Sequence, residues 1–403
     1  MQTKTKNKTK RWTSRRHDVI IWLASLVLYP WTKLKCHVKI TPCKELRRRQ
    51  CLVIMNHQTV FDQFFVSFAL FPRHVYFISS DEHFSLGFIS TLLRWAVAPI
   101  PIKKQQTDVK AVMTCRQVAR EGGTIALAPE GNRTFSGLPC HINPAIAGLV
   151  KKLDLPLAIF RIEGGYGIQP RWSKVCRRGK MRAYVRKIIE PEEYRSLTKD
   201  QLMDLIREEL YVDETQNPGP FRHKKLAEGL EQVVYVCPKC GLSEFRGEND
   251  IITCKNCGLQ VRYLPDQHLE GVNGDFHFPY VAQWYQYQED YVNQLDVNDY
   301  LEKPLFRDKA RFSSIVSGKS RTLLDGNATV LLYGNRFQVG DKTLFFDDIS
   351  GATVQGKNKL NIYHADGVYQ IWGLDKANVI KHMNIYHRYR NQKEGNGSQF
   401  LGM

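Results

Sequence analysis

A histidine and an aspartate stand five residues apart in the stretch Asn56-His57-Gln58-Thr59-Val60-Phe61-Asp62, directly after the apolar run 51–55. On a regular helix, such positions are separated by about 140° around the axis. His57 and Asp62 can therefore pair only if His57 lies in a strand-to-helix turn and Asp62 reaches back from the first helical turn. The carboxylate would then fix one imidazole nitrogen and leave the other to take a proton. This spacing is typical of a general-base dyad, although an isolated histidine near an aspartate is more often structural.

A second polar group follows another apolar run, 124–128, in the stretch Ala128-Pro129-Glu130-Gly131-Asn132-Arg133. Glycine at position 131 allows the backbone to approach a ligand closely. The guanidinium of Arg133 offers a planar pair of donors that suits a phosphate group. Both polar groups lie at predicted strand ends, so they indicate one site that binds a phosphorylated substrate beside a general base.

The combination of Asn-His-x-x-x-x-Asp and Pro-Glu-Gly-x-Arg resembles the motifs of the glycerol-phosphate and lysophosphatidate (1-acyl-sn-glycerol-3-phosphate) acyltransferase family. The resemblance covers about residues 40–210 and includes two weaker blocks, 99–104 and 155–159. The first of these ends in Lys103-Lys104, where the family usually has arginine. Many members carry Lys-Lys-Gly where this chain has Asn143-Pro144-Ala145, a departure that bears on the acceptor head group.

The resemblance implies transfer of a fatty acyl chain from a thioester donor, acyl carrier protein or coenzyme A, to a hydroxyl of a lysophospholipid or glycerol phosphate. The implied acceptor is 1-acylglycerol-3-phosphate. His57 would deprotonate the hydroxyl, and Asp62 would fix the tautomer and stabilise the imidazolium. No catalytic cofactor is expected. The implied substrate-binding residues are Lys103, Lys104, Glu130, Gly131 and Arg133.

Two other functions are compatible with parts of the pattern. A catalytically idle membrane adaptor would act through the C-terminal half of the chain, but the intact set of His57, Asp62, Glu130 and Arg133 argues against it. A thioester hydrolase would use water as the acceptor, and its phosphate-binding residues would then have no purpose.

Four cysteines form two CxxCG knuckles with thirteen residues between them. Glycine after each pair lets backbone amides turn toward the thiolates, and four thiolates make a closed tetrahedral site, which is typical of structural zinc. The unit resembles the zinc-ribbon family. The other six cysteines show no disulfide spacing, which suits a reducing cytosol. The expected zinc ligands are Cys237, Cys240, Cys254 and Cys257.

Apolar runs alternate with helical patterns up to about residue 215, which predicts an α/β fold with a mainly parallel central sheet flanked by helices. Short runs separated by turn residues then predict a C-terminal β-rich domain that ends in a helix and resembles a pleckstrin-homology-like domain. The expected division is 1–35, basic tail and anchor; 36–215, acyltransferase domain; 233–263, zinc ribbon; 275–304, connecting helix; 305–392, β-rich domain.

Positive charge is concentrated in two places. Residues 1–50 carry 14 Lys/Arg and two acidic residues. Residues 171–187 carry eight Lys/Arg and no acidic residue. The first patch adjoins the apolar run 19–31, which as a helix is about 20 Å long and too short to span a bilayer upright. Together they predict an interfacial anchor on an anionic membrane, at its cytoplasmic face. The second patch interleaves apolar and aromatic residues with charge, a pattern that fits a strand pair at a membrane surface. No RNA-binding motif accompanies it, so no nucleic acid is expected.

Overall fold

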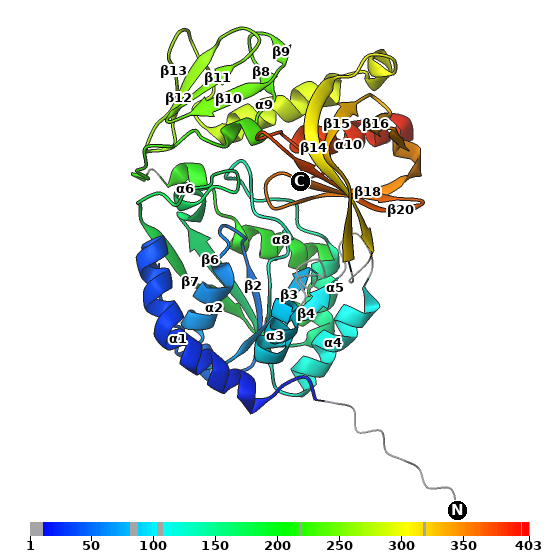
Figure 1. Cartoon of the computed structure of the whole chain (residues 1–403). Helices are drawn as coiled ribbons and strands as arrows, with labels where there is room; N and C mark the ends of the chain where they lie inside the picture. Colours follow the sequence, from blue (N-terminus) through cyan, green and yellow to red (C-terminus); the bar gives the residue numbers. More distant parts are fainter. Residues whose placement is uncertain are drawn as a thin grey trace, which may run out of the picture. The chain divides into compact units, whose positions relative to one another are not determined.

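The computed structural model describes residues 11–80, 88–102, 108–217, 219–316, 320–395 and 397–402. The chain divides into two compact units and passes between them several times. Unit 1 comprises Met1–Gly131, Ile142–Ile162 and Arg182–Tyr211. Unit 2 comprises Asn132–His141, Glu163–Met181 and Val212–Met403. Figure 1 labels many of the helices and strands of both units.

Unit 1 is built on a seven-stranded sheet in the order β1-β7-β6-β2-β5-β3-β4. The pairings among β6, β2, β5, β3 and β4 are all parallel. The central strands β2 and β5 are buried at every position, as expected for a parallel sheet covered by helices on both faces. Their bounds are β1 Val38–Ile40, β2 Leu52–Met55, β3 Val75–Ser80, β4 Ile100–Ile102, β5 Thr124–Leu127, β6 Leu157–Glu163 and β7 Met181–Ile189.

Helices flank this sheet (Figure 1) and close a core centred on Ile54, Ile125 and Ile159, none of which is exposed. Polar side chains begin two of them: Asp108 accepts from the Ala111 amide, and Thr198 forms a capping box. The predicted α/β fold with a parallel central sheet is confirmed. The bounds are α1 Arg15–Cys36, η1 Glu45–Arg47, α2 Asp62–Ala69, α3 Phe88–Val97, α4 Val109–Arg120, α5 Ala145–Leu153, α7 Pro191–Arg195 and α8 Lys199–Leu210.

The N-terminal helix is longer than the sequence pattern indicated. The apolar run 19–31 lies inside α1, whose 22 residues make a helix of about 33 Å. Ser14 caps its start, and Pro30 does not end it. The expectation that this segment is too short to span a bilayer is therefore wrong: by length and composition alone, α1 could cross one. One side of α1 contacts α2, since Tyr29 packs on Phe68 and Trp31 on Phe61.

Unit 2 begins with two small sheets, β8-β9 and the antiparallel β10-β11-β12-β13, followed by a long helix. Trp284 of that helix is fully buried and donates from Nε1 to the Val236 carbonyl, which holds the helix against the short strands. The bounds are α6 Gly165–Ile168, η3 Glu214–Gln216, η4 Leu230–Gln232, β8 Val236–Cys237, β9 Gly241–Leu242, β10 Phe245–Glu248, β11 Ile251–Cys254, β12 Gln260–Tyr263, β13 Leu269–Gly271, α9 Val281–Gln294 and η5 Val297–Tyr300.

The C-terminal part of unit 2 is a second seven-stranded sheet, antiparallel at all six pairings, in the order β17-β16-β15-β14-β20-β19-β18. The predicted β-rich domain is thus present; its pleckstrin-homology-like identity stays a prediction. One hydrophobic core joins this sheet to the preceding strands and α9. The bounds are β14 Phe306–Val316, β15 Ser320–Leu332, β16 Arg336–Val339, β17 Lys342–Phe345, η6 Phe346–Asp348, β18 Ile349–Gln355, β19 Lys359–His364, β20 Gly367–Gly373 and α10 Ile380–Glu394.

The basic stretch 171–187 is only partly a surface feature. Arg171, Trp172 and Arg177 are buried in unit 2. Arg177 donates from Nη2 to the Leu226 carbonyl and lies over the rings of Trp172 and Tyr263. The expectation of a surface strand pair is therefore wrong for this part of the stretch, because these guanidiniums satisfy buried carbonyl groups.

Asn56 joins β2 to β6 at the edge where both strands end. Its buried amide donates to the Ile162 carbonyl and accepts from the Ile162 amide, both at 2.8 Å. This pair replaces the ladder hydrogen bonds at the point where β2 turns away, and a buried backbone group without a partner is costly.

We therefore expect Asn56→Ala to destabilise unit 1 by about 2–4 kcal/mol, since two buried backbone groups each lose a partner. Chemical denaturation followed by circular dichroism measures the change. Asn298→Ala, which alters an exposed 3-10 turn in unit 2, is the control. A loss below about 0.5 kcal/mol, the size of an ordinary surface substitution, would contradict the bridging role.

Candidate active site

Two polar loops leave the unit 1 sheet side by side. Strands β2 and β5 pair in parallel, with Ile54 opposite Leu127. His57 and Glu130 each stand three residues beyond that pair, one after each strand. In open α/β sheets, ligands bind at the carboxyl ends of the strands. The sheet thus places His57 and Glu130 beyond the carboxyl ends of two adjacent strands, where ligands bind in folds of this kind.

His57 and Asp62 form the dyad that the spacing indicated. His57 Nδ1 lies 2.7 Å from Asp62 Oδ2, and the two side chains are 28% and 0% exposed. The carboxylate can only accept, so Nδ1 carries the proton and Nε2 presents a lone pair. Within the described parts of the chain, nothing is hydrogen-bonded to Nε2. The arrangement can accept a proton from a ligand hydroxyl and return it.

The Asp62 carboxylate is surrounded by donors from the loop that precedes it. It accepts from the Gln58 amide at 2.7 Å, from the Thr59 amide at 2.9 Å and from Thr59 Oγ1 at 2.7 Å. Such donors stabilise a buried negative charge and fix both oxygen positions. Helix α2 begins at Asp62, and the Gln58 and Thr59 amides before it bind the carboxylate in a turn.

Glu130 and Gly131 shape the loop after β5. Glu130 is buried, and the Gly131 amide donates to the Ala128 carbonyl at 3.0 Å. Gly131 has φ +66°, a left-handed conformation that strains other residues, and its missing Cβ would meet nothing within 4 Å. The glycine is required by the turn itself.

The other predicted phosphate ligands are Arg133, Lys103 and Lys104. Arg133 lies in unit 2, where its backbone carbonyl accepts from Arg171 Nη1 at 2.9 Å. Burial, and next the charge of Arg133, lower the pKa of the Arg171 guanidinium to about 9. Lys103 and Lys104 follow β4 and lie outside the described residues.

Two residues that shape the site, Asn56 and Thr59, are not among the site residues predicted from the sequence. Asn56 fixes the end of β2, and Thr59 supplies two of the donors to Asp62. Their types were informative: asparagine and threonine next to a strand end commonly bind backbone or carboxylate groups locally. Nothing in the sequence showed that the partner of Asn56 would be Ile162, because that contact depends on strand order.

The four knuckle cysteines converge in unit 2. Their sulfur atoms all lie within 4.8 Å of one another. Gly241 and Gly258 follow the two knuckles with φ +76° and +74°, as the sequence pattern required. The Gly258 amide donates to the Cys254 carbonyl at 3.0 Å and closes the second knuckle. This cluster of four sulfurs could hold one metal ion, and the predicted ligand set is brought together.

Comparisons with known proteins show which part of the chain resembles a known family. Residues 37–162 match the family described as Acyltransferase. The 1-acyl-sn-glycerophosphate (LPA) acyltransferase PlsC from Thermotoga maritima is a structural match with a TM-score of 0.38 and 16% identity, over 50% of this chain and 77% of that one. No curated protein sequence matches the chain. The family match covers β2, the dyad and the Glu130–Arg133 loop, so the similarity to the Acyltransferase family at residues 37–162 includes both sequence motifs.

Proposed function

We propose that this protein transfers a fatty acyl chain from a thioester donor to a hydroxyl of a lysophospholipid or glycerol phosphate, with 1-acylglycerol-3-phosphate as acceptor. The observation that carries the proposal is the His57–Asp62 pair at the end of β2, inside the segment that matches the Acyltransferase family. The donor is acyl carrier protein or coenzyme A.

In this reaction, His57 Nε2 takes the proton of the acceptor hydroxyl while its oxygen attacks the thioester carbonyl. The C–S bond then breaks, and the imidazolium returns the proton to the leaving thiolate. Asp62 holds the Nδ1–H group throughout and stabilises the imidazolium. Because loop donors already fix the carboxylate, little reorganisation is needed when the charge develops.

Acceptor binding uses the groups that the family resemblance implies. Arg133, Lys103 and Lys104 would bind the phosphate, and Glu130 and Gly131 would shape the loop. A guanidinium suits this role because it forms charge-assisted, forked contacts with phosphate oxygens.

We expect His57→Ala to lower the rate of acyl transfer by about 10²–10⁴-fold, the usual contribution of a general base. Mass spectrometry of lipids formed from lysophosphatidate and acyl thioesters measures the product. His277→Ala, which removes an exposed histidine from unit 2, is the matched control. A folded His57→Ala protein with wild-type turnover would overturn the assignment.

The metal of the cysteine cluster is zinc in this proposal, and its role is structural. All four cluster ligands are sulfur, and a four-thiolate site has no open position for a substrate. When bound, the ion would tie the β8–β9 hairpin to the end of β11 through Cys237, Cys240, Cys254 and Cys257.

Elemental analysis of the purified protein should find one zinc per chain. Cys257→Ser should lose the metal and loosen the ribbon, because metal binding and folding are coupled in such units. Cys43→Ser, at a partly buried cysteine of unit 1, should keep it. Full zinc content in Cys257→Ser would exclude this ligand set.

Membrane association belongs to unit 1 in this proposal. Leu26 and Val27 of α1 are 61% and 70% exposed, and α3 exposes Leu92, Leu93 and Trp95. The packed side of α1 carries the buried residues His17, Thr32 and Cys36, and Tyr29 and Trp31 contact the rings of Phe68 and Phe61. A helix with one packed side and one exposed apolar side suits the membrane interface, at the cytoplasmic face.

The double substitution Leu26→Glu/Val27→Glu should reduce vesicle binding at least tenfold, because each apolar side chain contributes about 1.5–3 kcal/mol when it leaves water. Cosedimentation with anionic vesicles at high salt isolates this apolar contribution from charge attraction. Val109→Glu, an exposed position on α4, is the control. Unchanged sedimentation of the double variant would place the anchor elsewhere.

A further inference from the structure

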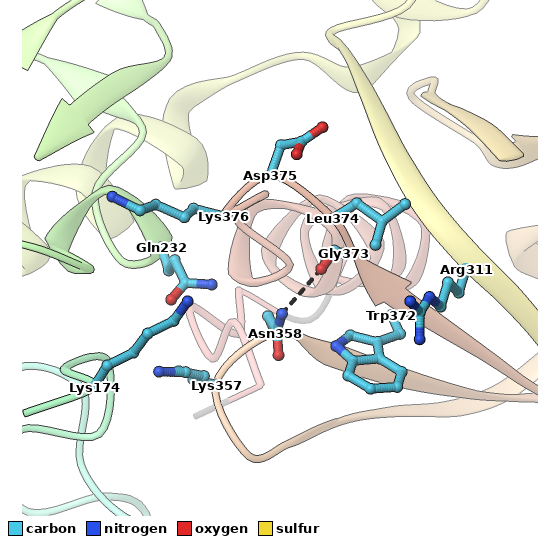
Figure 2. A pocket seen from close by; sticks show the side chains of 10 residues that line it. All are labelled: Lys174, Gln232, Arg311, Lys357, Asn358, Trp372, Gly373, Leu374, Asp375 and Lys376. Carbon is cyan, nitrogen blue, oxygen red and sulfur yellow. Dashed lines mark hydrogen bonds between the residues drawn. The ribbon is translucent and has the colours of Figure 1, made fainter. Parts of the chain in front are cut away.

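A cavity of about 340 Å³ in unit 2 is lined by cations from segments far apart in the sequence. Lys174 comes from the loop before β7, Lys357 from the turn between β18 and β19, and Lys376 from the loop before α10. Figure 2 shows Lys174, Gln232 and Lys357 on one side of the cavity, with Trp372 and Arg311 on the other. None of the predicted acyl-transfer residues lines it.

The turn that carries Lys357 is held rigidly. Asn358 Nδ2 donates to the Gly373 carbonyl at 2.9 Å, as Figure 2 shows, and the Gly373 amide donates back to the Asn358 carbonyl at 2.9 Å. On the other side, buried Arg171 donates to the carbonyls of Gly356 and Val354 at 2.6 and 2.8 Å. The position of the Lys357 backbone is therefore set before any ligand arrives.

The cations of the cavity are unevenly compensated. Lys376 is paired with Glu231 at 2.8 Å, and Arg311 lies over the Trp372 ring at 5.1 Å. Among the described residues, no carboxylate forms an ion pair with Lys174 or Lys357. Burial, and then the charges of Lys174 and Arg133, lower the pKa of the Lys357 ammonium to about 8. Like charges are thus held close together, where an anion would stabilise them.

A buried polar group also faces this space. Gln232 is 2% exposed, and its Oε1 atom has no hydrogen-bond partner in the described parts of the chain. An unpartnered buried amide costs free energy unless a ligand or water binds it. Rotation of the amide would present its Nε2–H group as a donor beside the two lysines.

We propose that this cavity binds a phosphate-bearing anion through Lys174, Lys357 and the Gln232 amide. A phosphate group accepts several hydrogen bonds and supplies the negative charge that would pair with the two ammonium groups. The cavity has room for more than one phosphate group, so a phosphorylated molecule such as a glycerol phosphate fits it. Two sources share this chemistry, a soluble phosphate ester and the head group of a membrane lipid.

Two probes distinguish the sources in experiments on the full-length protein. Isothermal titration calorimetry measures binding of glycerol 3-phosphate. Cosedimentation compares phosphatidylcholine vesicles with and without phosphatidate. In the combined variant Lys174→Ala/Lys357→Met, affinity for glycerol 3-phosphate or for phosphatidate vesicles, whichever the wild type binds, should fall about 10–100-fold. This is the size expected for lost charge-assisted contacts. Lys357→Met keeps the apolar stem of the half-buried side chain.

Matched variants separate this site from folding and from catalysis. Lys174→Glu alters only an exposed side chain. It should weaken binding of the same probe without changing the thermal unfolding of the protein. Lys303→Ala removes a cation of unit 2 from outside the cavity and should bind like wild type. His57→Ala keeps the cavity and should also bind normally, so loss of acyl transfer does not affect this test.

An effect on glycerol 3-phosphate identifies a soluble ester, and an effect confined to phosphatidate vesicles identifies a lipid head group. If both lysine variants unfold as wild type does and bind both probes with unchanged affinity, the proposal is wrong. Equal losses in Lys303→Ala and in the lysine variants would also overturn it, because they would reflect general surface charge.

Discussion

The chemistry of unit 1 depends on one buried carboxylate. Asp62 is inaccessible to solvent, and an isolated charge there would be strongly unfavourable. The Gln58 and Thr59 amides and the Thr59 hydroxyl, just before the start of α2, remove that penalty. The same donors that stabilise the charge orient the oxygen that holds His57. Folding of the loop therefore also fixes the geometry of the His57–Asp62 pair.

Unit 2 relies on buried guanidiniums in a comparable way. Arg171 donates to the Arg133 carbonyl and to two carbonyls at the end of β18, and Arg177 serves carbonyls elsewhere in the unit. Each guanidinium offers five donors in a planar fork and can join several segments at once. The loop that carries Arg133 and the turn that carries Lys357 are thereby held by one side chain.

The basic character of the chain is consequently divided among different tasks. Arg171 and Arg177 are internal supports, Lys376 neutralises a buried glutamate, and Lys174 and Lys357 remain for an anion. Net charge predicts only that anionic partners are favoured. The burial of each cation and the position of the nearest acidic side chain decide which cation can bind an anionic partner.

Local patterns in the sequence determined the parallel α/β fold, the pairing of His57 with Asp62 and the convergence of the four cysteines. Each depends on spacing within a short segment: strand followed by turn, or a knuckle closed by glycine. Tertiary structure alone decided that Asn56 would bind Ile162, that the apolar run would extend into the longer helix α1, and that Arg171 would be buried. It also brought Lys174 and Lys357 to one cavity. Apart from the length of α1, these features depend on strand order and on packing between segments more than a hundred residues apart, which periodicity and motif spacing do not encode.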